Sequence, residues 1–315
     1  REDLMISAIV IALIYAFVAA LLLQGIRRIV VAHSQFRKGP SIFQTFYDFF
    51  KLLGKESLTP NVTSPLLFNL APILSVAAMV VAALIIPLAA TTPAVGAGDL
   101  ILVIYLLTIP PFALILGGSA SGSPYGAIGA TREVALLIAY ETPFIVAMVA
   151  TAIAAGSFQL STISTTAYVT VLPLATIAAI WTLPAAAGVQ PFDICEAETE
   201  ICSGPYVEYS GPNLALLQLG QWLKTFLYAS LIAAVFFGTF MFQYQPIINF
   251  IVQFIIIAVL ITVFIAFWQA TTGRTRVTHL LRYYWSVPMA LAVVDLLLYV
   301  AGVRYMHLLF GWAGV

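Results

Sequence analysis

The chain has 315 residues, of which 62% are hydrophobic and 8% charged, and its formal net charge is zero. A soluble domain has about 45–50% apolar and about 25% charged residues, so this composition excludes a water-soluble enzyme, a nucleic-acid-binding protein and a disordered scaffold. We therefore expect a protein embedded in lipid. The two cysteines, Cys195 and Cys202, and three scattered histidines indicate neither a disulfide framework nor a metal site. We expect no cofactor or metal on this chain.

Eight apolar segments are long enough to cross a bilayer as helices. A helix needs roughly 20 mainly apolar residues to span ~30 Å of hydrocarbon, and these runs are too long for barrel strands and do not alternate. The expected spans are residues 4–24, 66–89, 100–116, 133–155, 167–189, 214–240, 246–268 and 287–306. Pro110-Pro111 and the Gly/Ser-rich residues 117–129 suggest a broken or re-entrant third span. The predicted fold is one all-α membrane domain over residues 1–315.

The basic residues predict the orientation of these spans. Lys and Arg collect in the cytoplasmic loops of membrane proteins, and ten of the 13 fall in loops on one predicted side. These ten are Arg27, Arg28, Arg37, Lys38, Lys51, Lys55, Arg132, Arg274, Arg276 and Arg282. The other side has only Arg1 and Arg304. We therefore expect the basic loops to be cytoplasmic and both termini to lie outside the cell membrane.

The first cytoplasmic loop contains an amphipathic segment. Apolar residues recur at helical spacing over residues 42–53, while Asp48, Lys51 and Lys55 fall on the opposite face. This pattern predicts a helix that lies in the membrane interface. Such a helix serves either as an anchor or as a platform for a cytoplasmic partner. The preceding Arg37-Lys38 adds positive charge, which also favours anionic lipid.

Three ionisable residues fall inside predicted spans: Glu141, Lys224 and Asp295. Each costs about 2.5–3.5 kcal/mol on insertion scales, so a functional role is the default hypothesis. Glu141 lies eight residues beyond Glu133, or roughly 12 Å deeper in a helix. Two interpretations remain: a buried ion pair between Lys224 and one of the acids, or a path for protons or ions, which we favour.

The loop over residues 190–212 carries five carboxylates and no basic residue. The carboxylates belong to Asp193, Glu196, Glu198, Glu200 and Glu208. A helix there would place Asp193, Glu196 and Glu200 on one face, and crowded carboxylates raise one another's pKa, as suits groups that exchange protons. The alternatives are a solvated acidic loop and an oxygen cage for a cation such as calcium. The apolar residues within the loop favour a packed, proton-handling loop.

Four segments resemble motifs of the eight-helix membrane subunit shared by respiratory complex I (its H, or first, subunit) and the membrane-bound, energy-converting nickel-iron hydrogenases. They are residues 37–56 (RKGPSIFQTFYDFFKLLGKE), 122–143 (GSPYGAIGATREVALLIAYETP), 191–211 (PFDICEAETEICSGPYVEYSG) and 273–285 (GRTRVTHLLRYYW). The resemblance covers almost the whole chain, and the four motifs occur in the family's order.

The resemblance implies a subunit, not catalytic alone, that joins a cytoplasmic, ferredoxin-linked redox arm to an ion-pumping membrane arm. The nickel-iron centre and iron-sulfur clusters would lie on large and small cytoplasmic partner subunits, and antiporter-like subunits would flank the chain in the membrane. The candidate proton or ion path comprises Glu133, Glu141, Asp193, Glu196, Glu198, Glu200, Glu208, Lys224 and Asp295. The candidate docking residues for the redox arm are Arg37, Lys38, Gly39, Pro40, Asp48, Lys51, Arg132, Arg274, Arg276 and Arg282.

Details of the motifs favour the hydrogenase branch. Ser41-Ile42 follows Gly39-Pro40, where quinone-reducing relatives usually carry Asn-Arg, and Lys224 is also more typical of hydrogenases. Cys195 stands where complex I relatives usually have proline. A quinone-reducing complex I subunit and a sulfur-reducing relative of the hydrogenases are the alternatives within the family. An autonomous secondary ion transporter is the alternative from another class.

Overall fold

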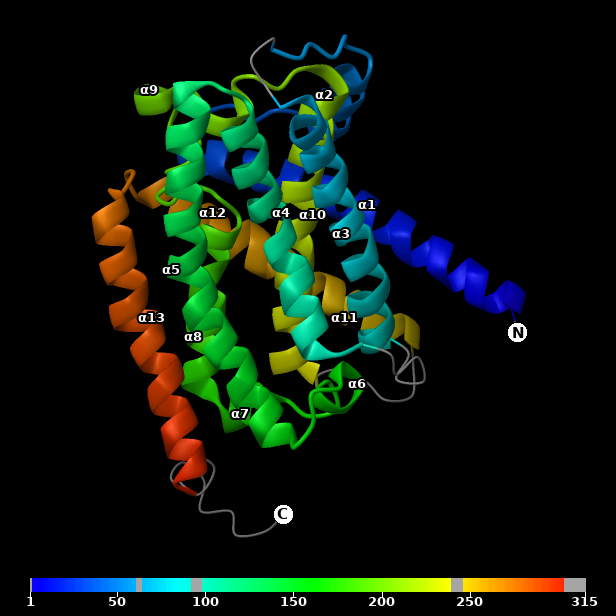
Figure 1. The fold of residues 1–315 in the computed structure, drawn as a ribbon. Helices are drawn as coiled ribbons and strands as arrows, with labels where there is room; N and C mark the ends of the chain where they lie inside the picture. The colour runs from blue at the N-terminus through cyan, green and yellow to red at the C-terminus, as the bar shows by residue number, and fades with distance from the viewer. Residues whose placement is uncertain (1, 61–63, 92–97, 239–245, 303–315) are drawn as a thin grey trace.

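The computed structural model describes residues 2–60, 64–91, 98–238 and 246–302 (Figure 1). In this part of the chain the regular structure is helical, apart from one isolated bridge between Asp99 and Gln159. The longer helices are α1 (Glu2–Ser34), α2 (Gln44–Leu53), α3 (Pro65–Thr91), α4 (Leu100–Ala120), α5 (Pro124–Ala155), α8 (Pro173–Ala186), α10 (Gly211–Phe236), α11 (Pro246–Val259) and α13 (Val277–Val300). The shorter ones are α6 (Leu160–Ile163), α7 (Tyr168–Val171), α9 (Glu198–Ile201), η1 (Gly204–Tyr206), the π-helix η3 (Leu260–Ile265) and α12 (Ala266–Thr271).

Within the described residues, seven helices are long and apolar enough to cross a membrane. They correspond to seven of the eight expected spans, and α11, η3 and α12 together supply one of them. The expected fifth span, residues 167–189, is instead divided: the backbone breaks at Leu172 between α7 and α8. The proline that begins α8 explains the break, since it cannot continue the helix before it. α8 alone has 14 residues, or roughly 21 Å of helix.

The third span is a single helix, so the expected interruption is wrong. α4 runs without a break from Leu100 to Ala120 and contains both Pro110 and Pro111, whose side chains are buried. A proline removes one intrahelical hydrogen bond, but membrane helices tolerate this loss where neighbouring helices pack around the site. α3 and α5 pack against α4.

Several helices begin or end far from the predicted boundaries. α1 continues ten residues past the expected end at residue 24, and α13 begins ten residues before residue 287. α5 begins at Pro124, where proline occupies the first turn, so Glu133 lies well inside the helix. Some expectations fall on residues outside the described part. These are the ends of the sixth and eighth spans, the outer loops around residues 92–97 and 241–245, and the C-terminus.

α10 is the central helix of the bundle. Its side chains from Leu223 to Phe236 are all buried, and α1, α3, α4 and α8 pack around it. Close approach to α3 requires glycine at one position, because a Cβ on Gly220 would lie 2.0 Å from the Ser75 Oγ. α1 is oblique to the other long helices, and its N-terminal half extends away from the bundle (Figure 1).

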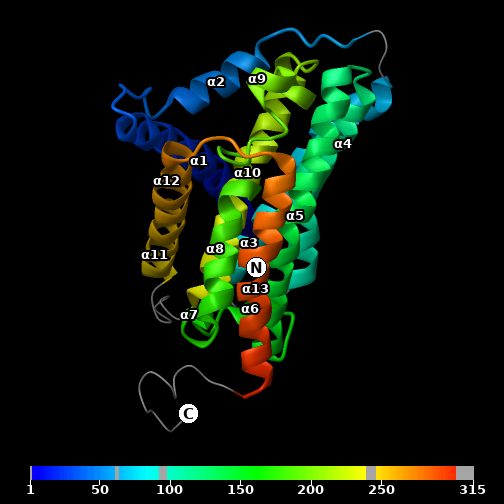
Figure 2. The same cartoon turned by 90° about the vertical axis from the view of Figure 1, so that its left-hand side faces the viewer.

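The four motif segments gather at one end of the bundle. Figures 1 and 2 show α2, α9 and the turn between α4 and α5 at that end, with the link from α12 to α13 nearby, whereas α6 and α7 lie at the opposite end. The chain therefore passes from one end to the other between α7 and the acidic loop. α2 is helical as expected and packs Thr45 and Phe49 inward, while Phe43 and Phe50 are exposed.

Candidate functional site

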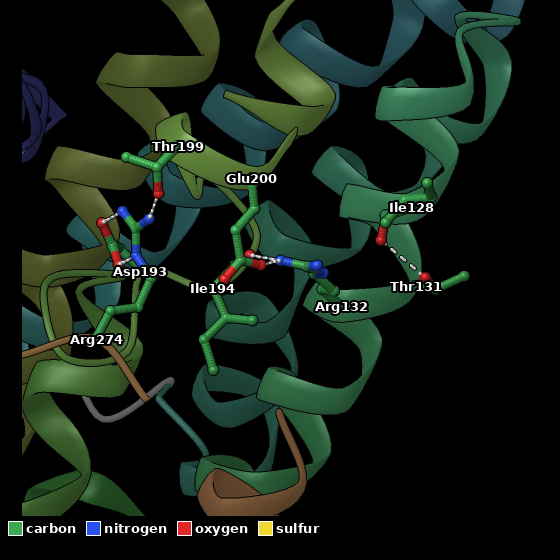
Figure 3. A network of polar contacts seen from close by, with 8 residues as sticks. All are labelled: Ile128, Thr131, Arg132, Asp193, Ile194, Thr199, Glu200 and Arg274. Carbon is green, nitrogen blue, oxygen red and sulfur yellow. Dashed lines mark hydrogen bonds and ion pairs between the residues drawn. The ribbon is translucent and has the colours of Figure 1, made fainter. Parts of the chain in front are cut away.

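The acidic loop, residues 190–212, is held by two arginines from other segments (Figure 3). Arg274 donates to both carboxylate oxygens of Asp193, at 2.8 Å each, and Arg132 donates to the Glu200 Oε2 at 2.6 Å. Arg274 also donates to the Thr199 hydroxyl at 2.9 Å. Paired, two-pronged contacts of this kind are the stronger class of charged hydrogen bond. The arginines thus fix the loop against α5 and against the segment before α13.

The expected helix through Asp193, Glu196 and Glu200 does not form. Before α10 begins at Gly211, only α9 and η1 are helical in this loop, so Asp193 and Glu196 lie in irregular backbone. Asp193 and Glu200 point to different arginines instead of sharing one face (Figure 3). We expected these carboxylates to crowd together and raise one another's pKa. In the structure Asp193 and Glu200 instead each bind an arginine. Glu208 is half-buried.

Below the loop, three ionisable side chains are buried between α5 and α10. Glu133 and Glu141 on α5 are 4% and 7% exposed, and Lys224 on α10 is fully buried. Lys224 donates a 2.9 Å hydrogen bond to the Tyr140 hydroxyl and lies 5.1 Å from the centre of that ring. It is also near enough to both glutamates to interact with them electrostatically.

No ion pair joins Lys224 to an acid in the described part of the chain, so the buried ion pair is not what this structure contains. Both carboxylate oxygens of Glu141 are buried and have no hydrogen-bond partner among the described residues. Asp295 has a different place: it accepts a 2.7 Å hydrogen bond from the Ala175 N–H in the first turn of α8. It therefore caps a helix whose start would otherwise carry free donors.

Cys195 connects the acidic loop to the buried acids. Its thiol is buried and interacts with the carboxyl group of Glu133. Burial raises the pKa of the Cys195 thiol well above its usual value, and the charge of Glu133 adds to the effect. The backbone here is tight: a Cβ on Gly204, whose φ is +51°, would lie 2.2 Å from the Cys195 carbonyl oxygen. η1 of the loop packs against α5, and Cys195 joins the loop to Glu133 on the same helix.

A polar cavity of about 570 Å³ lies beside this arrangement, between α1, α10, α12 and the acidic loop. Most of its lining side chains are charged or amides: Gln24, Arg27, Arg28, Asp48, Gln190, Asp193, Glu196, Gln218, Gln221 and Gln269. Arg27 is 6% exposed and donates to the Gln269 Oε1 at 3.0 Å, while its Nε is buried with no partner among the described residues. A roomy cavity with this many polar partners suits ordered water.

The composition and motifs of the sequence do not predict this cavity, but one pattern on α10 indicates a polar surface there. Gln218, Gln221 and Thr225 recur at i, i+3 and i+7 and so form a polar stripe on a mostly apolar helix. The apolar run of the first span ends at residue 24, so the sequence places Arg27 in a loop and not in a buried cavity wall. At the rim of the cavity, burial and then the charge of Glu196 raise the pKa of Tyr206 well above its usual value.

The expected docking residues divide into two groups. Arg37, Lys38, Lys51, Arg276 and Arg282 are exposed, as is Pro40, whereas Gly39 is half-buried. Asp48 is paired with Arg28 at 2.8 Å, and Arg132 and Arg274 bind the acidic loop. Partial burial raises the pKa of Asp48, but hydrogen bonds from Arg28 and Gln44 outweigh it and leave the pKa below its usual value. The side chain of Glu198 lies outside the described part of the structure.

Comparison with known proteins assigns the chain to a family. The family model described as NADH dehydrogenase matches residues 6–300. The chain belongs to this family. It is 39% identical over 221 residues to hydrogenase-4 component C of Escherichia coli, covering 68% of this chain and 70% of that protein. It is 31% identical over 297 residues to the H subunit of the NADH-quinone oxidoreductase of Brevibacillus brevis, covering 90% and 88% of the two chains.

A solved structure extends the likeness to three dimensions. The chain superimposes on a subunit of a membrane-bound sulfane sulfur reductase, an archaeal respiratory membrane complex, with a TM-score of 0.82 and 28% identity. The match covers 93% of this chain and 99% of that one. The resemblance deduced from the four motifs is therefore confirmed, as is an all-α, multi-pass membrane protein.

Proposed function

We propose that this chain is the membrane subunit of a hydrogenase-like complex and passes protons or ions from a cytoplasmic redox arm toward a pumping membrane arm. The observation that carries the proposal is Glu141, a carboxyl group buried between helices with both oxygens unpartnered among the described residues, close to buried Lys224. A structural carboxylate would be expected to satisfy its oxygens. One that exchanges protons with water or a neighbour needs room to change partners.

The geometry supports an order for the path. The polar cavity, which Glu196 lines, suits water, and Cys195 interacts with both Glu196 and buried Glu133. Lys224 interacts with both Glu133 and Glu141, and the Tyr140 hydroxyl lies beside its ammonium group. Protons would pass from the cavity to Glu133 and then to Glu141. Internal water would bridge the gaps that direct hydrogen bonds do not cover.

We further propose that the loop end of the bundle faces the cytoplasm. The positive-inside rule applies to the ten basic residues that gather there, and the α7–α8 segment returns the chain from the opposite end. Eight crossings with both termini outside follow from that topology. Four exposed basic residues of this end would dock the large and small redox subunits, which would carry the nickel-iron centre and iron-sulfur clusters: Arg37, Lys38, Lys51 and Arg276.

The relatives support a subunit of a complex over an autonomous transporter. Formate hydrogenlyase subunit 4 of E. coli, 35% identical over 227 residues, is a subunit by name, like the relatives above. The cavity bears on the electron acceptor, because sites for apolar cofactors are lined mainly by apolar and aromatic side chains. Charged and amide side chains dominate here, which favours water and protons over a quinone.

Copurification combined with one variant tests the proposal. A tagged chain should bring down a nickel-iron large subunit and an iron-sulfur subunit, identified by mass spectrometry. Glu196→Gln should then lower turnover and ion uptake more than the amount of assembled complex, because the amide keeps most hydrogen bonding but no longer titrates. The exposed Glu56→Gln serves as the matched control. Equal loss of assembly and turnover in Glu196→Gln would assign the loop a structural role.

A further inference from the structure

A second cavity, also of about 570 Å³, opens where α12 ends and α13 begins. It lies apart from the proposed proton path. Three aromatic side chains, Phe192, Trp268 and Tyr283, form much of its wall. The guanidinium of Arg282 and the imidazole of His279 line the same cavity. A site with one apolar and one basic side is suited to a ligand that has both an apolar and an anionic part.

The aromatic wall is preformed. The ring of Phe192 lies 6.3 Å from that of Tyr283 and 6.2 Å from that of Trp268. The indole N–H of Trp181 donates to the Tyr283 hydroxyl and so fixes the second ring. A rigid wall lowers the entropy cost of binding a flexible chain.

The side chains of His279 and Arg282 are available for a ligand. His279 and Arg282 are three residues apart on α13, so they lie on one face of the helix. Both side chains are exposed, and among the described residues neither has a hydrogen-bond or ion-pair partner. Arg132 and Arg274 differ in this respect, since carboxylates of the acidic loop occupy them.

The surroundings of the cavity are those of a membrane interface. Exposed apolar side chains flank the cavity on both sides. On η3 and α12 these are Val263 and Phe267, each 60% exposed, and on α13 they are Trp285 and Val287, which are 54% and 43% exposed. Both helices belong to candidate membrane spans, and the cavity lies where those spans end. Aromatic and basic side chains at that depth are the usual anchors at the boundary of the bilayer.

We propose that this cavity binds one anionic phospholipid. Arg282 and His279 hold the phosphate, and the glycerol backbone and the start of an acyl chain lie against Phe192, Trp268 and Tyr283. Arg282 therefore serves the membrane side of the protein instead of the redox arm. A lipid at this place ties the acidic-loop end of the bundle to α12 and α13, because Phe192 belongs to the loop.

Native mass spectrometry of the delipidated, intact complex tests this site. The probes are dioleoyl phosphatidylglycerol, dioleoyl phosphatidylcholine and inorganic phosphate. We expect tight binding of one phosphatidylglycerol to the wild type, and an about fivefold weaker affinity or loss of that lipid in Arg282→Gln, the usual contribution of one basic residue near a membrane surface. Arg282→Lys should retain it because the positive charge remains. Lys55→Gln, which removes an exposed charge far along the chain and outside the docking residues, is the matched control.

Four outcomes overturn the proposal. The first is equal binding of phosphatidylglycerol to Arg282→Gln and to the wild type. The second is equal affinity of the wild type for phosphatidylcholine. The third is displacement of the lipid by millimolar inorganic phosphate, which would indicate a site for a free anion. The fourth is a photo-cross-linker at Ser286 that labels a protein subunit and no lipid, since a partner would then cover the cavity.

Discussion

Replacement of Glu141 by glutamine separates a proton-transfer role from a structural role. Glutamine has nearly the shape of glutamate but cannot titrate. An unpartnered buried polar group costs roughly 1–3 kcal/mol, and Glu141 already carries two buried oxygens without a partner among the described residues. The amide of the glutamine would be buried without a partner in the same way and at a similar cost, so we expect the free energy of unfolding to change by less than about 1 kcal/mol. Assembly should therefore be preserved.

The effect on ion movement should be much larger. A positioned acid or base contributes about 10²–10⁴-fold to the rate of a proton-transfer step, so we expect at least a tenfold loss of ion uptake into inverted vesicles. Electron transfer to an artificial acceptor, measured in the same vesicles, should stay near the wild-type rate, because no redox group is expected on this chain. Glu56→Gln is the control. Wild-type ion uptake by Glu141→Gln vesicles would refute the reasoning, and a parallel loss of assembled complex would assign Glu141 a structural role.

Three further outcomes follow from the acidic-loop end of the bundle. Arg274→Gln should lower the stability of the complex by about 1–3 kcal/mol, because it leaves the half-buried Asp193 without its two hydrogen bonds. A double-mutant cycle with Asp193→Asn, measured by thermal unfolding, should give a coupling energy of at least about 0.5 kcal/mol. Gly204→Ala should reduce the yield of assembled complex on native gels, since φ is +51° and the Cβ has no room, whereas Gly273→Ala, with nothing within 4 Å, should not. Hydrogen bonds from Arg28 and Gln44 leave the pKa of Asp48 below its usual value, so its ion pair stabilises α2 fully above the usual carboxyl pKa and loses this contribution as the pH falls through the lowered pKa. Hydrogen exchange of α2 should therefore rise only in that acidic range.

Sequence alone locates the long helices because their signal is local. Length and apolar content within a single segment decide whether that segment can span a bilayer. The same signal fails at boundaries, where a polar residue can still be helical. Arg27 illustrates this: it lies beyond the apolar run, yet α1 continues through it and buries its guanidinium against Gln269. The partner that makes burial possible is 242 residues away in the chain.

The prediction for the acidic loop fails for the same physical reason. Its carboxylates look unpaired in the sequence because the loop itself contains no basic residue. The arginines that pair with them lie 68 and 81 residues away, and their contacts decide the backbone path as much as local helix propensity does. The buried Glu141 and Lys224 can be found from sequence, since a charge inside an apolar run stands out, whereas Glu133 stands beside Arg132 at the edge of its expected span. Whether they form ion pairs depends on the rotation of α5 and α10, which sequence periodicity does not fix.

Charge balance among those three buried groups implies that the proposed proton path carries a single mobile charge. A buried charge is tolerated only when an opposite charge compensates it, and Lys224 can compensate one carboxylate at a time. With Lys224 protonated, the low-cost state has one ionised glutamate and one neutral one, and the negative charge can reside on Glu133 or on Glu141 without changing the total. Moving a proton from one carboxyl to the other then costs little, because Lys224 interacts with both. A fixed hydrogen bond to Glu141 would hold the charge on it, whereas its carboxylate oxygens have no hydrogen-bond partner among the described residues, as the proposed path requires.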